Sequence, residues 1–501
     1  MPFDLKTAGY WTALAGRLKP DTGLFIDGDF VEARGGGRFA TINPATDAVL
    51  AEVARGGAAD IDRAVASARR AFRTAPWARI PPRARMEVLY RFADLIEAHA
   101  EAFAVLDAQD MGKPIAEMLT IDVPGSLACF RFMAEAADKI TGSTTVTGEQ
   151  ALHYILRQPL GVVGCIVPWN YPLMMAAWKI APALAAGNAV VLKPAEQSPL
   201  SALLLGRLFV EAGGPPGILN VVPGFGEEAG QALARHMDVD KIAFTGSGEV
   251  GGLMMEYAGQ SNLKHVSTEC GGKSPHVIMA DAPDLEAAVN TAVAGIYGNQ
   301  GEVCSAGSRI LVERAILPDV LDAFAARTRE TVHVGDPLDP ATTLGPLVTR
   351  SHQRRVLDYI DTGRAEGARL AFGGVVPPGC EGGAYVAPTL FADVDNGMRI
   401  ASEEIFGPVG AVIPFDGLDE ALRIANDTVY GLAAGLWTRD LTKAHRFAAG
   451  VECGMVWING YMNGDMTQPW GGWKQTGNGR DKCFEAVVAH TQTKSVWVTL
   501  G

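Results

Sequence analysis

Short apolar runs alternate with helical stretches in the middle of the chain, between residues 160 and 270. Five runs have the length of strands: GVVGCIVP (161–168), NAVVLKP (188–194), ILNVVPG (218–224), KIAFTG (241–246) and LKHVSTE (263–269). Helical periodicity follows at 174–186, 199–212 and 227–236, and as an apolar stripe at Val250, Leu253, Met254, Tyr257 and Ala258. Apolar strands that do not alternate suit a sheet covered on both faces, so the pattern predicts a parallel, doubly wound α/β sheet.

Different patterns flank this block. Residues 60–140 are rich in Ala, Arg and Glu with helical periodicity. Residues 141–160 are first rich in Thr and Ser and then alternate, which predicts a β-hairpin. After residue 270 a second α/β pattern begins with SPHVIM, a helix over 287–294 and SRILVE, and TKSVWVTL predicts a last strand. With 501 residues, the chain is expected to form two or three domains.

Composition and charge narrow the class of protein. Hydrophobic residues make up 48% and charged residues 20%, which is ordinary for a soluble globular protein. The net charge of −13 argues against nucleic acid or an anionic membrane surface as partners and permits a cationic substrate. No apolar run approaches the ~18 residues of a membrane span, and the N-terminus lacks a signal-peptide core, so a soluble cytoplasmic protein is expected.

The seven cysteines are scattered and odd in number, which fits a reducing compartment rather than a disulfide scaffold. No C-x-x-C pair and no H-x-x-x-H spacing occurs, so no metal site is expected. One cysteine, Cys304 in NQGEVCSAGSR, lies between a turn at Gly301 and the small residues Ala306 and Gly307, where the backbone can approach a ligand closely. A buried cysteine is ordinarily a small hydrophobe. The neighbouring strand-end motifs favour a nucleophile instead, whereas Cys270 stays open.

Three of these motifs follow predicted strands. Asn170 in PWNYP lies at the carboxyl edge where open α/β sheets bind ligands, and it is either a turn residue or an amide donor for an oxyanion. Lys193 and Glu196 in LKPAEQSP form either a capped turn or a contact to an adenosine ribose. The stretch 246–251, GSGEVG, matches the G-x-G-x-x-G dinucleotide fingerprint. That fingerprint expects an acidic residue about 20 residues on, so Glu269 either holds a ribose or takes part in chemistry.

Seven stretches together resemble the aldehyde dehydrogenase superfamily, in its order and at its spacing: PWNYP, KPAEQSP, FTGSGEVG, ECGGKSP, NQGEVCSAGSR, EEIFGPV and PWGGWKQTGNGR. The resemblance covers essentially the whole chain from LFIDGDF to the C-terminal strand. The phosphate-side turn of that superfamily has a G-S-x-x-x-G pattern, so Gly248 matches the stricter fingerprint incidentally. The resemblance assigns the adenosine ribose to Lys193 and Glu196, and it leaves Glu269 free to act as general base.

The resemblance also implies the remaining site residues. The implied catalytic residues are Cys304, Glu269, Asn170 and Lys179. The implied cofactor contacts are Pro168, Trp169, Lys193, Glu196, Gly226, Phe244, Gly246, Ser247, Val250, Gly271, Glu404 and Phe406. The implied substrate contacts are Tyr171, Met174, Trp178, Val303, Asp465 and Trp470, although core packing explains the apolar members equally well. NAD is the implied cofactor and NADP is possible, because the charge of Glu196 repels a 2′-phosphate without excluding it.

The implied fold has three parts. A five-stranded Rossmann-like NAD-binding domain comprises 1–140 and 161–270, an α/β catalytic domain comprises 271–475, and an oligomerisation element comprises 141–160 and 476–501. Unpaired strands of such an element need a partner, so a dimer or tetramer of identical chains is expected.

The implied reaction is oxidation of an aldehyde to its acid. The Cys304 thiolate attacks the aldehyde, the Asn170 amide and the Cys304 N–H hold the oxyanion, hydride leaves to NAD, and Glu269 activates water to hydrolyse the thioester. Backbone amides and the nicotinamide charge are expected to lower the pKa of Cys304, and an apolar pocket is expected to raise that of Glu269.

The stretches YMNGDMTQPWGGWKQTGNGRDKCFEA and GFGEEAGQALARH resemble the γ-glutamyl-γ-aminobutyraldehyde dehydrogenases of putrescine breakdown, so an ω-amino or γ-glutamylamino aldehyde is the expected substrate. Met462-Asn463 departs from the Asn-Asp of that subgroup, and Trp470 and Trp473 replace Phe and Tyr. A broad-specificity aldehyde dehydrogenase is the alternative. The presence of Glu269 argues against a CoA-acylating enzyme. The presence of Cys304, Glu269 and Asn170 together argues against a non-catalytic structural protein. A thiol hydrolase that needs no cofactor is also disfavoured, because no histidine stands near Cys304 in the sequence.

Overall fold

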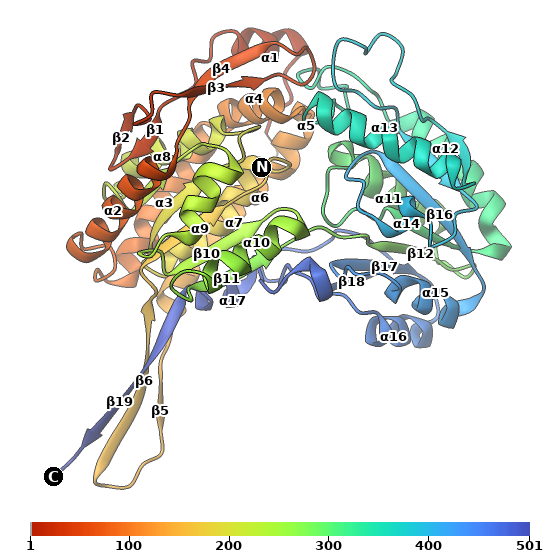
Figure 1. Ribbon diagram of the computed structural model, residues 1–501. Helices are drawn as coiled ribbons and strands as arrows, with labels where there is room; N and C mark the ends of the chain where they lie inside the picture. The colour runs from red at the N-terminus through yellow and green to blue at the C-terminus, as the bar shows by residue number, and fades with distance from the viewer. Residues whose placement is uncertain (1–2) are drawn as a thin grey trace.

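Two seven-stranded sheets and a slender three-stranded arm make up the protein (Figure 1). The structure is a computed structural model and describes residues 3–501. The first half of the chain builds the sheet and helices on the left of Figure 1, and the second half builds those on the right. Within the described residues, no helix is both long and apolar enough to cross a lipid bilayer.

The first sheet has the strand order β11-β10-β7-β8-β9-β1-β2. Its strands are β1 (Leu24–Ile26), β2 (Asp29–Val31), β7 (Val162–Ile166), β8 (Ala189–Lys193), β9 (Leu219–Val221), β10 (Lys241–Thr245) and β11 (His265–Glu269). The five predicted strands are confirmed and run parallel. The expectation of five strands is wrong in one respect, because β1 adds antiparallel to β9 and β2 adds antiparallel to β1. Each has only three residues, too few to show a periodicity.

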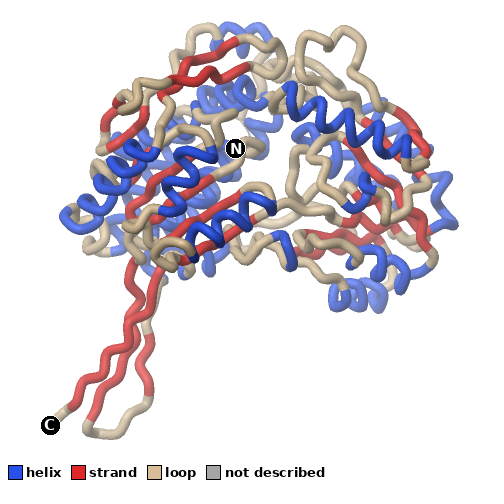
Figure 2. Tube along the Cα trace, viewed as in Figure 1, coloured by secondary structure: helices blue, strands red, loops and turns tan. Residues whose placement is uncertain are grey.

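Helices enclose this sheet (Figure 2). Those of the N-terminal region are α1 (Ala8–Ala15), α2 (Ala58–Thr74), α3 (Pro82–Ala98), α4 (Ala100–Met111), α5 (Ile115–Glu117) and α6 (Val123–Ala136), which confirms the helical prediction for 60–140. Those between the strands are α7 (Pro172–Ala185), α8 (Leu200–Glu211), α9 (Gln231–Arg235) and α10 (Gly248–Gly259). A two-stranded ribbon, β3 (Arg38–Ile42) and β4 (Val49–Ala54), pairs on its own.

The predicted apolar stripe on α10 is only partly core. Met254, Tyr257 and Ala258 are buried, but Val250 and Leu253 are each 37% exposed. The predicted helix is confirmed, and its apolar stripe runs from the core onto the surface. Exposed apolar side chains at the start of a helix leave a surface on which a flat ligand can pack.

The second sheet has the order β14-β15-β16-β13-β12-β17-β18, parallel apart from the pair β14 and β15. Its strands are β12 (Pro275–Ile278), β13 (Arg309–Glu313), β14 (Arg369–Phe372), β15 (Thr389–Ala392), β16 (Val409–Phe415), β17 (Ala433–Trp437) and β18 (Met455–Ile458). Its helices are α11 (Leu285–Tyr297), α12 (Leu317–Thr331), α13 (Arg350–Ala365), α14 (Arg399–Ser402), α15 (Gly417–Asn426), α16 (Leu441–Gly450) and α17 (Cys483–Val488), the last of which returns to pack on α6 and α7. The predicted second α/β pattern is confirmed.

The arm consists of β5 (Ser143–Thr145), β6 (Ala151–Pro159) and β19 (Thr491–Thr499). The hairpin predicted over 141–160 and the predicted last strand are both confirmed. Strand β19 pairs antiparallel with β6 from Ala151↔Thr499 to Pro159↔Thr491. The arm projects away from both sheets (Figure 1), and its outer strands β5 and β19 have free edges within the described residues.

Candidate active site

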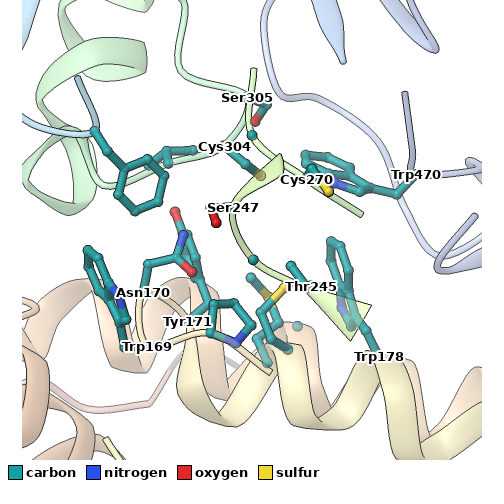
Figure 3. A pocket seen from close by; sticks show the side chains of 18 of the residues that line it. Trp169, Asn170, Tyr171, Trp178, Thr245, Ser247, Cys270, Cys304, Ser305 and Trp470 are labelled. Atoms are coloured by element: carbon teal, nitrogen blue, oxygen red, sulfur yellow. The ribbon is translucent and has the colours of Figure 1, made fainter. Parts of the chain in front are cut away.

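A cavity of about 470 Å³ lies between the two sheets, at the carboxyl ends of strands β7, β10 and β11. The loop that precedes β13 closes it from the other side and carries Cys304. Figure 3 shows Asn170 and Cys304 near its centre, Trp169 on one side, and Trp178 with Trp470 on the other. The predicted residues that line the cavity are Pro168, Trp169, Asn170, Tyr171, Met174, Trp178, Gly246, Ser247, Gly271, Val303, Cys304, Glu404, Phe406 and Trp470.

The structure does not place every predicted residue on the cavity wall. Those that do not line it are Lys179, Lys193, Glu196, Gly226, Phe244, Val250, Glu269 and Asp465. Residues that sequence reasoning missed do line it: Ile121, Gly125, Met175, Thr245, Cys270, Ser305, His352, Arg355, Met462, Gly464, Met466 and Lys482. Most of these have no local signal, because they come from segments that only the fold brings together.

A strained turn presents Cys304 to the cavity. Asn299, Gln300 and Gly301 all have left-handed backbone, with φ of 46°, 55° and 73°. Such a run is rare for residues other than glycine and persists only where the surroundings enforce it. At Gly301 a Cβ atom would collide with the carbonyl of Gly407, so only glycine fits this close approach. The predicted role of Gly301 as a turn residue therefore has a steric reason.

The thiol of Cys304 is less acidic than we expected from the sequence. Burial raises its pKa to about 12, and the nearby carboxylates of Glu404 and Glu269 add to the rise. The backbone N–H groups of Ser305 and Cys304 lower it, as expected, but by less. Desolvation therefore outweighs the amides. The lowering expected from the nicotinamide charge stays a prediction.

Asn170 is oriented by the nucleophile loop. Its side-chain Nδ2 donates a hydrogen bond of 2.8 Å to the carbonyl of Glu302, and Asn299 Nδ2 donates one of 2.9 Å to the Asn170 carbonyl. An amide nitrogen carries two hydrogens, so one remains to donate into the cavity. The Cys304 N–H has no backbone acceptor within residues 3–501. These two donors fit an oxyanion formed on a carbonyl carbon bound to Cys304.

We expect Asn170→Ala to lower kcat by roughly 100- to 1,000-fold, because it removes one oxyanion donor. KM should change much less, since the ground-state aldehyde oxygen carries little charge. Steady-state kinetics and circular dichroism measure both activity and folding. An Asn170→Asp variant of the same shape tests the donor specifically, and a near-normal kcat for either variant contradicts this role.

Glu269 ends strand β11 and is 4% exposed. Neither carboxylate oxygen has a hydrogen-bond partner within the described residues. Burial, followed by the charge of Asp481, raises the pKa of Glu269 well above its usual range, which confirms the expected direction. The carboxyl group is turned towards Gly471 and Gly479, where added Cβ atoms would lie 2.7 and 2.8 Å from its Oε1. Its side chain must therefore rotate to reach the cavity.

A buried ion pair lies close enough to act on Glu269. Lys179 Nζ is 2.6 Å from Asp481 Oδ2, and both side chains are almost fully buried. The Lys179 charge lowers the pKa of Glu269, whereas Asp481 raises it. Sequence reasoning named Lys179 and missed Asp481. The only signal for Asp481 was its place in the Gly-rich segment NGRDK, next to a basic residue on each side.

The opposite end of the cavity is built for close approach of a ligand. Glu404 accepts a hydrogen bond of 3.1 Å from the Gly272 N–H, and burial raises its pKa to about 7. A Cβ at Gly271 would collide with the Glu404 carboxylate, so that position requires glycine. Phe406 adopts φ of 62° and packs edge-on against Trp169, with ring centroids 5.3 Å apart.

The predicted contacts to the adenosine ribose lie outside the central cavity, whereas Gly246 and Ser247 of the phosphate-side turn line it. Lys193 is buried at the end of β8, and its Nζ is 3.0 Å from Glu196 Oε2. Glu196 borders a second hollow, of about 530 Å³, which Phe225 also lines. Ser247 caps the N-terminus of α10 by accepting a hydrogen bond from the Val250 N–H. The other predicted contacts are Gly226, which begins a π-helical turn (Gly226–Gly230), and Phe244, which packs under Gly246.

These features fit a class of enzyme with a thiol nucleophile, an oxyanion site and a nucleotide-binding edge. Residues 30–496 match the aldehyde dehydrogenase family, so the chain belongs to that family. It is 47% identical, over 98% of both chains, to the NADP/NAD-dependent aldehyde dehydrogenase PuuC of Escherichia coli (strain K12).

Solved structures agree with this assignment. An indole-3-acetaldehyde dehydrogenase complexed with NAD⁺ is 49% identical, with a TM-score of 0.97 over 99% of this chain and 100% of that one. The γ-glutamyl-γ-aminobutyraldehyde dehydrogenase from Burkholderia cenocepacia J2315 is 48% identical, with the same TM-score and coverage. The predicted fold class, an aldehyde dehydrogenase-like α/β fold, is confirmed. Within residues 3–501, no group of three or more His, Cys, Asp or Glu side chains is placed to hold a metal ion.

Proposed function

We propose that this aldehyde dehydrogenase oxidises an aldehyde carrying nitrogen at its far end, of the ω-amino or γ-glutamylamino type, to the carboxylic acid with NAD. The observation that carries this proposal is the cavity, with Cys304 and Asn170 at its centre and Trp178, Trp470 and Met174 along one side. With the thiol and the amide at its centre and apolar side chains beyond them, the cavity can hold an aldehyde group against Cys304 and the rest of the substrate against Trp178 and Trp470. The similarity to a γ-glutamyl-γ-aminobutyraldehyde dehydrogenase supports the substrate class.

The residues on the nucleotide side fit a dinucleotide. Gly246 and Gly271 leave the backbone open where a side chain would collide with Phe244 or Glu404. Ser247 begins a helix whose free N–H groups favour a phosphate. Lys193 and Glu196 are suited to hold the ribose hydroxyls, Val250 offers an exposed apolar surface for a base, and NADP remains a second possible cofactor. Bound NAD supplies the hydride acceptor for the reaction.

The side chains of the protein perform the remaining steps. The Cys304 thiolate adds to the aldehyde carbon, while Asn170 Nδ2 and the Cys304 N–H stabilise the oxyanion. Once the carbon has been oxidised, the substrate is a thioester on Cys304. Glu269 rotates into the cavity and removes a proton from water, which hydrolyses the thioester and frees the thiol.

The substrate proposal is tested by NADH formation with aldehydes that differ in length and in the group at the far end: γ-glutamylaminobutyraldehyde, aminobutyraldehyde, guanidinobutyraldehyde, hydroxypropionaldehyde, hexanal and benzaldehyde. We expect the nitrogen-bearing aldehydes to have the highest kcat/KM. A flat or apolar-leaning profile contradicts the substrate class and favours a broad-specificity enzyme. Adding CoA to each assay and finding an acyl-CoA product instead of the acid contradicts hydrolysis by Glu269.

We also propose the division into cofactor-binding, catalytic and oligomerisation domains that the sequence predicts. Assembly of identical chains into an oligomer is part of the same proposal. The support is the arm, whose free edges at β5 and β19 can pair with another chain. Its exposed apolar side chains include Leu152 and Trp497, which is 61% exposed. A cytoplasmic location is supported by the seven cysteines, all of which are free.

A further inference from the structure

Lys482, which has no part in the proposed mechanism, lies beside the aromatic side chains on one side of the cavity. Lys482 lines the cavity and is 6% exposed. Its Nζ lies 5.7 Å from the ring centroid of Trp178 and 5.5 Å from that of Trp470. The two indoles pack edge to face with centroids 5.3 Å apart (Figure 3). The ammonium group therefore lies on the side of the cavity to which the far end of a substrate would extend.

The ammonium group of Lys482 has no anionic partner within residues 3–501, and none of the side-chain hydrogen bonds there involves its Nζ. Two other buried lysines, by contrast, form ion pairs: Lys113 with Asp122 at 2.7 Å, and Lys179 with Asp481 at 2.6 Å. The Lys482 ammonium group lies beside two indole faces, which attract a cation but cannot neutralise its charge. Because Lys482 lines the cavity and has no ion-pair partner among the residues that the structure describes, it is available to pair with an anion in the cavity.

The backbone holds Lys482 in a strained conformation. Its φ is 60°, and that of Cys483 is 34°, in the region that favours glycine. Trp470 and Asp481 exchange two backbone hydrogen bonds of 3.0 and 2.7 Å, and the Cys483 N–H donates to the carbonyl of Met466 at 2.7 Å. Strain of this kind persists where the surrounding structure over-determines it, commonly at ligand sites. The lysine is consequently fixed next to the indole pair.

A carboxylate stands near this lysine without pairing with it directly. Asp465 belongs to the 462–466 loop, whose residues Met462, Gly464 and Met466 line the cavity. The Asp465 Oδ1 accepts hydrogen bonds from the Thr467 N–H and Oγ–H, at 2.8 and 2.6 Å. Within the described residues Oδ2 accepts none. The Lys482 charge helps to lower the pKa of Asp465, so the two groups act on each other across the edge of the cavity.

We propose that Lys482 binds a carboxylate at the far end of the substrate and that Asp465 binds the ammonium group beside it. This inference rests on the proposed function and narrows it to aldehydes capped by an α-amino acid head group, as in a γ-glutamyl amide. A free ω-amino aldehyde places its ammonium group near that of Lys482, so among the nitrogen-bearing aldehydes its kcat/KM should rank below that of the γ-glutamyl compound. Lys482 is thus a specificity-determining residue, and the aldehyde oxidation itself is unchanged by this assignment.

The test uses three aldehydes built on 4-aminobutanal with the same amide spacer: the γ-glutamyl, glutaryl and pentanoyl derivatives. They carry a carboxylate with an ammonium group, a carboxylate alone, and no charge. A charge-assisted hydrogen bond predicts that wild-type enzyme has a kcat/KM for the glutaryl compound roughly 10- to 100-fold above that for the pentanoyl compound. Lys482→Met should abolish that ratio and Lys482→Arg should largely keep it. Asp465→Asn should lower the γ-glutamyl to glutaryl ratio only.

Each outcome is decisive. A ratio that survives in folded Lys482→Met overturns the inference. The inference can also be tested with wild-type enzyme alone, by comparing the glutaryl compound with the glutaramyl aldehyde, in which an amide replaces the carboxylate. Equal kcat/KM values for these two compounds overturn the inference even if Lys482→Met does not fold. Oxidation of hexanal together with no oxidation of any nitrogen-bearing aldehyde contradicts the proposed function instead, and so separates the two failures.

Discussion

Glu269→Gln is expected to release a burst of NADH about equal to the enzyme concentration and then to turn over slowly. The substitution keeps the shape of the side chain and removes the base, so formation of the thioester survives while its hydrolysis does not. General base catalysis is worth roughly 10²- to 10⁴-fold, and steady-state kcat should fall by that amount. Stopped-flow absorbance of NADH resolves the burst from the slow phase.

The pH dependence of wild-type hydrolysis provides the control. Burial raises the pKa of Glu269 well above its usual range. The carboxylate is the active form of a base, so deacylation should slow as the pH falls through that raised pKa. In Glu269→Gln this dependence should vanish. A variant with a normal steady-state rate, or one with no burst and no turnover, contradicts the assignment of Glu269 to hydrolysis.

Cys304→Ser is expected to lower aldehyde oxidation by about 10⁴-fold or more, because loss of a nucleophile removes the covalent route altogether. A hydroxyl is a far weaker nucleophile than a thiol in this setting, since the histidine that lines the cavity, His352, is hydrogen-bonded through Nε2 to the Phe406 carbonyl and not to Cys304. The measurement is NADH formation at high enzyme concentration. Binding of NAD, followed by quenching of tryptophan fluorescence, should persist in the variant and so separates lost chemistry from lost folding.

Cys380→Ala is the matched control for this variant, because Cys380 is also a free and partly exposed cysteine but lies away from the cavity. It should keep wild-type kinetics. If Cys380→Ala lost activity as Cys304→Ser does, or if Cys304→Ser kept more than a few per cent of it, the nucleophile would be misassigned.

Most of the first sheet was predictable because its strands are apolar runs bounded by turn residues. The run from Val162 to Ile166 is buried at every position, as parallel strands require. Strands β1 and β2 were not predictable, since three residues set no period and β1 pairs with a strand far along the chain, Phe25 lying opposite Val221 of β9. The exposure of Val250 and Leu253 could not be predicted either, because helical spacing identifies which residues share a face of the helix but not whether another element covers that face.

The site residues that could be predicted are those whose position follows from a single sequence motif. Cys304 and Asn170 line the same cavity although 134 positions separate them. Asn170 follows β7 and Cys304 precedes β13, and both lie where the two sheets face each other. The direction of the Glu269 side chain was not predictable, since it depends on Gly471 and Gly479 from the C-terminal loop. Lys482 was missed likewise: its partners Trp178 and Trp470 become neighbours only in the folded chain.

The central claim is that a thioester forms on Cys304 and that Glu269 hydrolyses it. The most direct measurement is intact mass and peptide mapping of Glu269→Gln after brief reaction with NAD and γ-glutamylaminobutyraldehyde. We predict one acyl group per chain, located on the peptide that contains Cys304, and none when NAD is omitted. An acyl group on another cysteine such as Cys270, or an unmodified chain despite a burst of NADH, would contradict the account.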